Sequence, residues 1–552
     1  MDRRRCRRGW TPRPRHRRHR RDADRHADRE SVHLGELLCQ RALPSTAGTR
    51  RTAPRGAHSD RRRQRRRPLD RRKRSVTRST RIVSTLLVTA LLAGCAIGPN
   101  YKRPAVAEPP TFRGQQIAEA QSFADAPWWE VFEDPRLKAL IHEALLNNYD
   151  VRIAAARVQE ARAFLSVARS DLYPSADYST SVSRGKVTPG VLGRPGGPSP
   201  EASNFYSGSM TVSWELDIWG RIRRLNEAAR ANLFATEDAR RGVWLTLVSD
   251  LVQAYFQLLS LDVRLQIARD SRDAYQRTFD LFQDRFSLGV ASKLETTRAQ
   301  GALGIAEATI PQLESDIVAQ ENQISILLGR TPGPIVRGHP MYEQPVTPTV
   351  PAGLPSTLLT RRPDLRQAEQ QLVSANARIG VAKAEFFPKL SLTALFGTAS
   401  PEVSALTGGS ATIWAVAGGL SGPLLNAGRT LGNYRATIAE WEQAKFQYEQ
   451  AVLTALREVA DALTALGKLS DAETGQDDAV NALTEAVDHA TARYRQGLAN
   501  YFEVLEAQQQ LYPAQSTLAQ IRRDRLLTHV RLYKALGGGW SLTDAQWTSE
   551  MP

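Results

Sequence analysis

Cysteine and histidine are scarce in this chain, and most of them lie in its first segment. The sequence holds three cysteines and nine histidines in 552 residues. Cys6 and Cys39 belong to an arginine-rich head, so the rest of the chain has one cysteine and no internal disulfide. The histidines beyond the head are scattered, without the spacing of a zinc site. We therefore expect neither a disulfide scaffold nor a metal centre.

Signature motifs of common enzymes are also missing. The sequence has no Walker A loop, no G-x-S-x-G elbow and no HExxH helix. The sequence therefore lacks the motifs for phosphate binding, serine hydrolysis and zinc-dependent proteolysis. We expect a protein that is not an enzyme and that holds no bound cofactor.

Excess positive charge is confined to the head. Residues 1–94 hold 29 Lys and Arg against 8 Asp and Glu, a net of +21, whereas the remainder carries a net of −4. Arginine clusters at 61–63 and 65–67 suit phosphates, but no nucleic-acid motif follows and only Trp10 interleaves them. We expect no nucleic-acid partner. Residues 1–75 are interpreted as an extension that is disordered or precedes the true translation start.

An export signal follows the head. A chain that starts at Val76 reads VTRSTRIVSTLLVTALLAGC, with two arginines and an apolar run too short to span a bilayer. After Met1 the next methionine is Met210, so such a start uses another codon. We expect a signal peptide over 76–94 and then an extended segment over 95–134.

The signal peptide ends in Leu92-Ala93-Gly94-Cys95, which resembles the bacterial lipobox. The resemblance implies that Cys95 becomes the first residue and carries diacylglycerol and an N-palmitoyl chain. Ala96, rather than aspartate, after the cysteine implies sorting to the outer membrane. A buried structural cysteine is the alternative, but Cys95 closes an apolar run and precedes an extended stretch. We therefore expect a lipid anchor at Cys95.

The chain beyond the extended segment is a tandem duplication. At an offset of 208 residues, Gly220 matches Gly428 within the same Gly-Arg pair, and the match continues to the end of each copy. Earlier in each copy the offset is 214, as for Pro174 and Pro388. We assign the copies, the proline-rich linker between them and the tail to 135–329, 330–353, 354–540 and 541–552.

A strand pair is expected in each copy, over 173–219 and 387–425. Tyr178 and Val182 belong to a run that alternates with polar residues, and the runs of about 9 to 11 residues suit tilted membrane strands. Each chain then supplies four strands, which cannot close a barrel. An open sheet edge in hydrocarbon leaves backbone groups unpaired. Three chains with twelve strands would close a barrel that is wide enough for a lumen.

Long helices account for most of the remaining residues. A first helix is expected at 135–170 and 354–384, and a proline-free helix of roughly 100 Å at 221–288 and 429–496. Threefold assembly would gather the long helices into a cylinder continuous with the barrel. An apolar stripe with helical spacing is interpreted as core packing. Its members are Trp244, Leu247, Val248, Leu251, Tyr255, Leu258 and Leu259.

A glycine-containing turn then leads to a return helix in each copy. These return helices end at Gly329 and Gly537, and we expect Pro311 and Pro513 to kink them. The fold expected is an α+β membrane protein with a trimeric twelve-stranded β-barrel and a long α-helical barrel.

Landmarks spread over residues 82–540 resemble the TolC-like outer membrane factors, in the NodT-type branch of RND efflux lipoproteins. The resemblance implies a β-barrel in the outer membrane that continues into an α-helical tunnel through the periplasm. It also implies a periplasmic adaptor and an inner-membrane RND-type pump as partners, with passive conduction of small molecules to the exterior. The landmarks are Cys95, 98–104, Trp128-Trp129, Asp134-Pro135, 214–221, 359–364, Phe387-Pro388 and 536–540.

The resemblance further implies where the tunnel is gated. Acidic rings match Glu503 and Glu506, which lie three residues apart and so share a helix face; six such carboxylates around a threefold axis would attract cations. A tyrosine-to-carboxylate latch matches Tyr494 and Glu295, although a basic residue that the family can carry nearby is Ala499 here. The turns that would contact the adaptor match Leu288, Gly289, Val290, Ala291, Gly497, Leu498 and Ala499.

Two other functions fit parts of this pattern. The exit duct of a type I protein secretion system uses the same fold, but the lipobox and the 361–364 landmark favour the pump-linked branch. A lipid-tethered helical scaffold without a pore is the second, and the duplicated hairpins argue against it. The sequence does not reveal which substrate is exported.

Overall fold

The chain separates into two units, Met1–Ser75 and Val76–Pro552. In a computed structural model, the second unit is described over 96–107, 109–115, 122–185, 202–344, 351–539, 541–543 and 546–547. The arginine-rich head, the predicted signal peptide and Cys95 lie outside the described residues.

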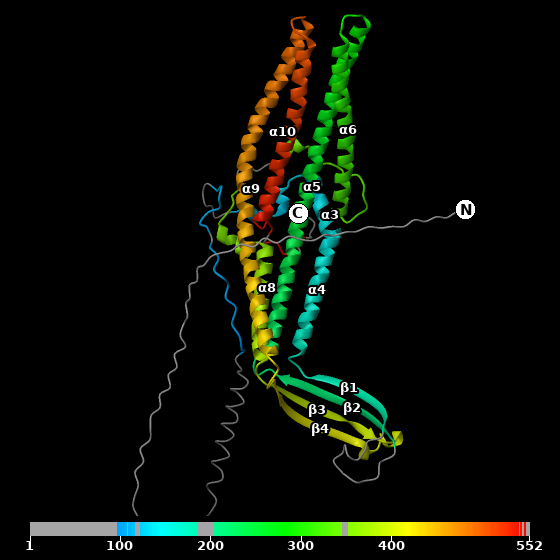
Figure 1. Ribbon diagram of the computed structural model, residues 1–552, viewed down its shortest axis with the longest axis vertical. Coiled ribbons are helices and arrows are strands. Elements are labelled where there is room, and N and C mark those ends of the chain that lie inside the picture. Colours follow the sequence, from blue (N-terminus) through cyan, green and yellow to red (C-terminus); the bar gives the residue numbers. More distant parts are fainter. Residues whose placement is uncertain are drawn as a thin grey trace, which may run out of the picture. The chain divides into compact units, whose positions relative to one another are not determined.

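One four-stranded antiparallel sheet lies at one end of the helices (Figure 1). Its strands follow chain order, and β2 pairs with β3, which joins the first copy to the second. The prediction of four strands per chain, one hairpin from each copy, is confirmed. The strands are β1 (Ser175–Gly185), β2 (Ser203–Leu216), β3 (Lys389–Ser400) and β4 (Thr412–Ser421).

The sheet has one apolar and one polar face, because side chains alternate along each strand. Tyr178, Met210, Phe396 and Trp414 are register partners and form a row across all four strands. On the opposite face of β1 and β2, serine hydroxyls meet in pairs. These pairs are Ser175–Ser213 at 2.9 Å, Ser179–Ser209 at 3.1 Å and Ser181–Ser207 at 2.8 Å.

The first helical segment of copy one is broken, so the single helix expected over 135–170 is wrong. The structure has α3 (Pro135–Asn147) and α4 (Tyr149–Ser170) with Asn148 between them. The backbone of Asn148 is extended, at ψ 135°, and its side chain accepts hydrogen bonds from two N–H groups of the next turn. An asparagine that caps a new helix in this way ends the preceding one.

A similar break occurs in the second copy, where one helix over 354–384 was expected. The structure has α7 (Leu358–Arg361) and α8 (Pro363–Ala384). Arg362 between them has ψ 123°. A residue that precedes proline is disfavoured in the helical region, because the proline ring clashes with its backbone.

The long helices begin and end close to the predicted residues. Helices α5 (Arg221–Ser287) and α9 (Arg429–Arg495) each have 67 residues, roughly 100 Å of helix. Their return partners, α6 (Lys293–Leu327) and α10 (Tyr501–Ala535), continue through Pro311 and Pro513. Neither proline ends its helix.

The helices pack side by side in two tiers (Figure 1). Near the sheet the order of contacts is α4–α5–α8–α9, and toward the turns it is α6–α5–α10–α9. Helices α5 and α9 therefore belong to both tiers. The short helices are η1 (Phe123–Asp125), α2 (Trp128–Val131), η3 (Met341–Glu343), η4 (Pro355–Thr357), η5 (Val403–Ala405) and η6 (Gly409–Ala411).

The largest core cluster surrounds the middle of α5. All seven residues of the predicted stripe are buried there, from Trp244 to Leu259, so its interpretation as core packing is confirmed. One 18-residue window of α5 reaches a mean hydropathy of 1.2, and 67% of that window is buried. We attribute the hydropathy of this window to packing among neighbouring helices.

A buried carboxylate ties the inter-copy linker to this core. Asp134 is fully buried and caps α3, accepting from two N–H groups of its first turn at 2.8 and 3.2 Å. It also accepts from the hydroxyl of Tyr255 at 3.1 Å, from the His339 N–H at 2.9 Å and from Gln344 Nε2 at 2.9 Å. Helix α3, helix α5 and the linker thus share one acceptor.

An N-terminal strap, residues 96–103, lies against the helices next to the sheet. The Ile97 N–H donates to the carbonyl of Trp219 at 3.0 Å. Arg224 is 5% exposed, and its guanidinium donates to the strap at 2.8 and 3.3 Å. Gly380 of α8 has no room for a side chain, because a Cβ there would lie 2.7 Å from a strap carbonyl. The strap therefore begins at the end of β2.

Candidate functional site at the helix tips

Two turns form the tips of the helical hairpins, at the end remote from the sheet (Figure 1). Gly289 has φ 75° and Gly497 has φ 74°, a left-handed conformation that glycine adopts without strain. In each turn the residue after the glycine donates a hydrogen bond back to the helix, to the carbonyl of Arg285 or of Arg493, at 2.9 Å. This is the Schellman pattern that ends a helix at glycine.

The tips expose apolar side chains. Leu288 is 77% exposed, Val290 65% and Leu498 67%. Ala291 and Ala499 are half-buried beside them. The predicted adaptor-contact residues therefore do lie at the ends of the hairpins, and their large apolar members have no cover within the described residues. Whether an adaptor binds there stays a prediction.

Glu295 caps the helix that leaves the first tip. The Ser292 N–H donates to Glu295 Oε2 at 2.7 Å, and the Ser292 hydroxyl donates to the same oxygen at 3.0 Å. The Ser292 hydroxyl oxygen in turn accepts from the Glu295 N–H at 3.3 Å. This reciprocal capping box satisfies backbone donors at the start of α6.

Tyr494, the other predicted latch residue, binds the first hairpin through an arginine. Its hydroxyl accepts a hydrogen bond from Arg285 Nη1, and the guanidinium carbon of Arg285 lies 5.8 Å from the centre of the Tyr494 ring. Tyr494 and Glu295 line the same open cavity of about 470 Å³. No hydrogen bond joins these two side chains within the described part of this single chain, and their pairing stays a prediction.

The two predicted acidic residues lie on the first turns of α10. Glu503 and Glu506 are both exposed. Glu503 lies 3.6 Å from Arg493 Nε, and these side chains are 48% and 56% exposed. A pair this exposed is weak, because solvent screens it. The ring of carboxylates around a threefold axis is not tested by one chain and stays a prediction.

A tyrosine holds the two hairpins together just behind the tips. Tyr501 bonds through its hydroxyl to the Thr278 hydroxyl, and its ring contacts that of Phe282 edge-on at 4.8 Å. Burial raises the pKa of Tyr501, so it stays protonated. These contacts could not be predicted from the sequence, because Tyr501 lies more than 200 positions from both partners.

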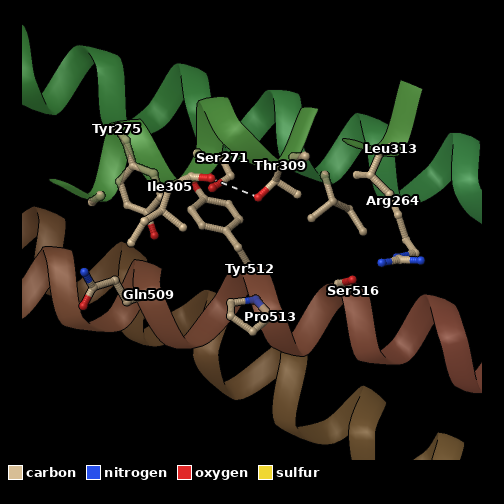
Figure 2. Close-up of a pocket in the computed structure, with 14 residues that line it drawn as sticks. Arg264, Ser271, Tyr275, Ile305, Thr309, Leu313, Gln509, Tyr512, Pro513 and Ser516 are labelled. Carbon is tan, nitrogen blue, oxygen red and sulfur yellow. Dashed lines mark hydrogen bonds between the residues drawn. The ribbon is translucent and has the colours of Figure 1, made fainter. Parts of the chain in front are cut away.

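A second cavity, of about 370 Å³, lies farther along the hairpins (Figure 2). Its lining comes from α5, α6 and α10 and includes Tyr275, Tyr512 and Ile305. The two tyrosine rings meet edge-on at 5.6 Å, and burial raises the pKa of Tyr275 to about 12. The Thr309 hydroxyl is already bonded to the Ile305 carbonyl at 2.9 Å. The lining is mainly apolar and brings no acid and base together.

The tandem repeat matches a known protein family twice. The outer membrane efflux protein family matches residues 140–330 and 354–538, one match for each copy. The chain belongs to this family. The predicted resemblance is confirmed, and so is the location in the outer membrane.

This chain aligns with nearly the whole length of several curated relatives. The cation efflux system protein CusC of Escherichia coli O6:H1 is 34% identical over 82% of this chain and 97% of its own. The solvent efflux pump outer membrane protein SrpC of Pseudomonas putida is 34% identical, with the same coverage. The probable outer membrane lipoprotein SilC of Salmonella typhimurium is 32% identical over 83% of this chain and 98% of its own.

Solved structures share the fold. A crystal structure of CusC has a TM-score of 0.72 at 32% identity, covering 81% of this chain and 100% of that chain. The outer-membrane channel OprN has a TM-score of 0.74 at 31% identity, with the same coverage. The protein is therefore an efflux protein of the outer membrane with the fold of a channel.

Proposed function

We propose that the protein is the outer-membrane exit duct of a tripartite efflux pump and performs no covalent chemistry. Small molecules would pass through it from an inner-membrane transporter and a periplasmic adaptor to the exterior. The observation that carries the proposal is the pair of incomplete edges that one chain presents.

The sheet has two edge strands whose outer backbone groups pair with no other strand in the described part of the chain. These are β1 and β4, and every residue of both strands is exposed. In a bilayer, each unpaired backbone group costs several kcal/mol. Closure by further copies of the same sheet removes both edges.

The helical tier next to the sheet also has an uncovered helix on each side. Its outer helices, α4 and α9, expose large apolar side chains, among them Phe164 and Val167 on α4 and Phe446 and Leu453 on α9. A contact between α4 of one copy and α9 of the next would cover both stripes. Such a head-to-tail interface closes into a ring when the rotation between copies allows it.

The strand count supports three copies. Two copies would give eight strands, and a barrel of about eight strands is filled by its own side chains. Three copies would give twelve strands and a lumen. The apolar row through Tyr178 and Trp414 would then face lipid, and the serine pairs would face water inside the barrel.

A lipid anchor at Cys95 fits the position of the strap. The strap begins at Ala96, beside the end of β2, and one further residue adds about 3.8 Å of chain. Acyl chains on Cys95 would then enter the membrane next to the barrel. Radiolabelled palmitate should enter the wild-type protein and not a Cys95→Ser variant; equal labelling of both contradicts the anchor.

The pump, rather than this duct, would select the class of molecule that is exported. Relatives of equal identity are named for cation efflux and for solvent efflux, so likeness alone does not choose between them.

The exposed apolar tips would contact the adaptor. Co-purification of the intact protein with a co-expressed adaptor and pump tests this. Leu288→Asp with Leu498→Asp should weaken adaptor binding, whereas Phe446→Asp should not reduce adaptor binding per assembled trimer.

Native mass spectrometry and planar-bilayer recording test the duct itself. We expect the acylated protein to be a trimer in detergent and to give discrete conductance steps. A trimer without conductance would favour a lipid-tethered scaffold, and a monomer would contradict ring closure. Secretion of a neighbouring exported protein that depends on this gene would favour the type I secretion duct instead.

A further inference from the structure

One contact joins the two hairpins of a chain at the very end of the helices. Arg285, in the last turn of α5, donates to the hydroxyl of Tyr494, in the last turn of α9, and its guanidinium faces the tyrosine ring. Both side chains are half-buried. The contact therefore combines a charge-assisted hydrogen bond with a cation–π interaction.

This contact is nearer the tips than the others that join the hairpins through side-chain hydrogen bonds. The bond between Thr278 and Tyr501 starts seven residues deeper along α5, about 10 Å of helix. Hairpins that separate from their free ends must therefore break the Arg285 contact first.

The duplicated partner of Arg285 does not make the same contact. At the offset of 208 residues its counterpart is Arg493, whose guanidinium lies 3.6 Å from Glu503 within its own hairpin. The counterpart of Tyr494 is Phe286, which has no hydroxyl. Within the described residues, the inter-hairpin tie therefore runs in one direction, from Arg285 to Tyr494, and the duplication supplies a matched control.

Arg285 also brings a positive charge to the cavity at the tips. The cavity at the tips is lined by Arg285, Glu295 and Tyr494, while Ala499 contributes no charge. The Tyr494 oxygen accepts from Arg285, so its own proton is still available for an acceptor such as the Glu295 carboxylate. One cation from the first hairpin thus orients the tyrosine of the second.

We propose that Arg285 is a positioning residue that holds the two hairpins of one subunit together at their tips and keeps the tunnel end narrow until an adaptor docks. The proposal rests on the proposed function as a gated duct. Loss of the tie lets the tips separate more often, which raises the open probability without changing the barrel.

Single-channel recording of full-length, acylated protein tests this. Arg285→Ala is expected to raise the open probability about fivefold, the factor that corresponds to about 1 kcal/mol. Tyr494→Phe removes one oxygen and should give a rise of the same sign. The double variant should exceed neither single variant by much, because both remove one interaction. Arg493→Ala should stay at the wild-type level.

Each result has a defined meaning. If Arg285→Ala matches Arg493→Ala, or if its effect adds fully to that of Tyr494→Phe, the tie is refuted. If Arg285→Ala does not assemble, the open probability of Tyr494→Phe is compared with that of Arg493→Ala instead. A higher value for Tyr494→Phe supports the tie, and an equal value refutes it. A wild-type protein that forms no channel refutes the proposed duct, whereas a conducting wild type with unaffected variants refutes only this inference.

Discussion

Loss of the buried carboxylate of Asp134 should destabilise the fold, because five hydrogen bonds converge on it. In Asp134→Ala, the first turn of α3 loses its cap, which costs about 1 kcal/mol. Donors at Tyr255, His339 and Gln344 lose an acceptor, and each buried unpaired donor costs about 1–3 kcal/mol. Because water can enter the space left by the carboxylate, we take the low end of that range and expect a total of about 4 kcal/mol.

The measurement is the thermal unfolding of detergent-purified protein, followed by circular dichroism. At pH 7 we expect Asp134→Ala to unfold roughly 4 °C below the wild type, because the unfolding entropy that divides the free-energy change grows with chain length. Glu133→Ala is the matched control, because the neighbouring Glu133 is exposed. A midpoint for Asp134→Ala within a degree of this control would refute the reasoning.

The pH dependence gives a second check on the same carboxylate. Burial alone would raise the pKa of Asp134, but hydrogen bonds from Gln344 and from three backbone N–H groups together lower it below the ordinary 3.8. A carboxyl whose pKa is lower in the folded state stabilises the protein above its unfolded pKa and loses that contribution as pH falls through its folded pKa. The gap between wild type and Asp134→Ala should therefore narrow below about pH 4.

Three further predictions concern the gate and the strap. Tyr494→Phe with Glu295→Ala should raise single-channel conductance in planar bilayers, and unchanged conductance would show that these two residues do not form a latch. Glu503→Gln with Glu506→Gln should reduce cation preference in reversal-potential measurements; an unaltered reversal potential would mean that these carboxylates do not line the pore. Gly380→Ala should lower the temperature at which the oligomer dissociates on gels, because its Cβ meets a strap carbonyl; an unshifted temperature would show that the strap is not needed there.

The periodic and repeated features of this chain could be predicted from its sequence. Gly220 and Gly428 mark the starts of the long helices because each adopts a left-handed conformation, at φ 79° and 85°. The proline-free stretches that follow are helical over the expected residues. The four strands could be placed because alternation and length both report on a two-faced sheet.

Interactions that depend on single side chains could not be predicted. The break at Asn148 needs its side chain to cap the next helix, and asparagine also occurs inside helices. The bond from Arg285 to Tyr494 joins residues 209 positions apart, and no local pattern distinguishes Arg285 from Arg493. The five-bond site of Asp134 was predicted only as a family landmark.

Cross-linking of the two sheet edges tests the central claim that separate chains close edge to edge into one tube. Cysteines would replace Ser179 on β1 and, in turn, Ala415 or Ala417 on β4, on the same face of the sheet. With a short bis-maleimide added to cells, a denaturing gel should show covalent species that end at three chains. Only monomers for every pair, or a ladder that runs on past three, would contradict the account.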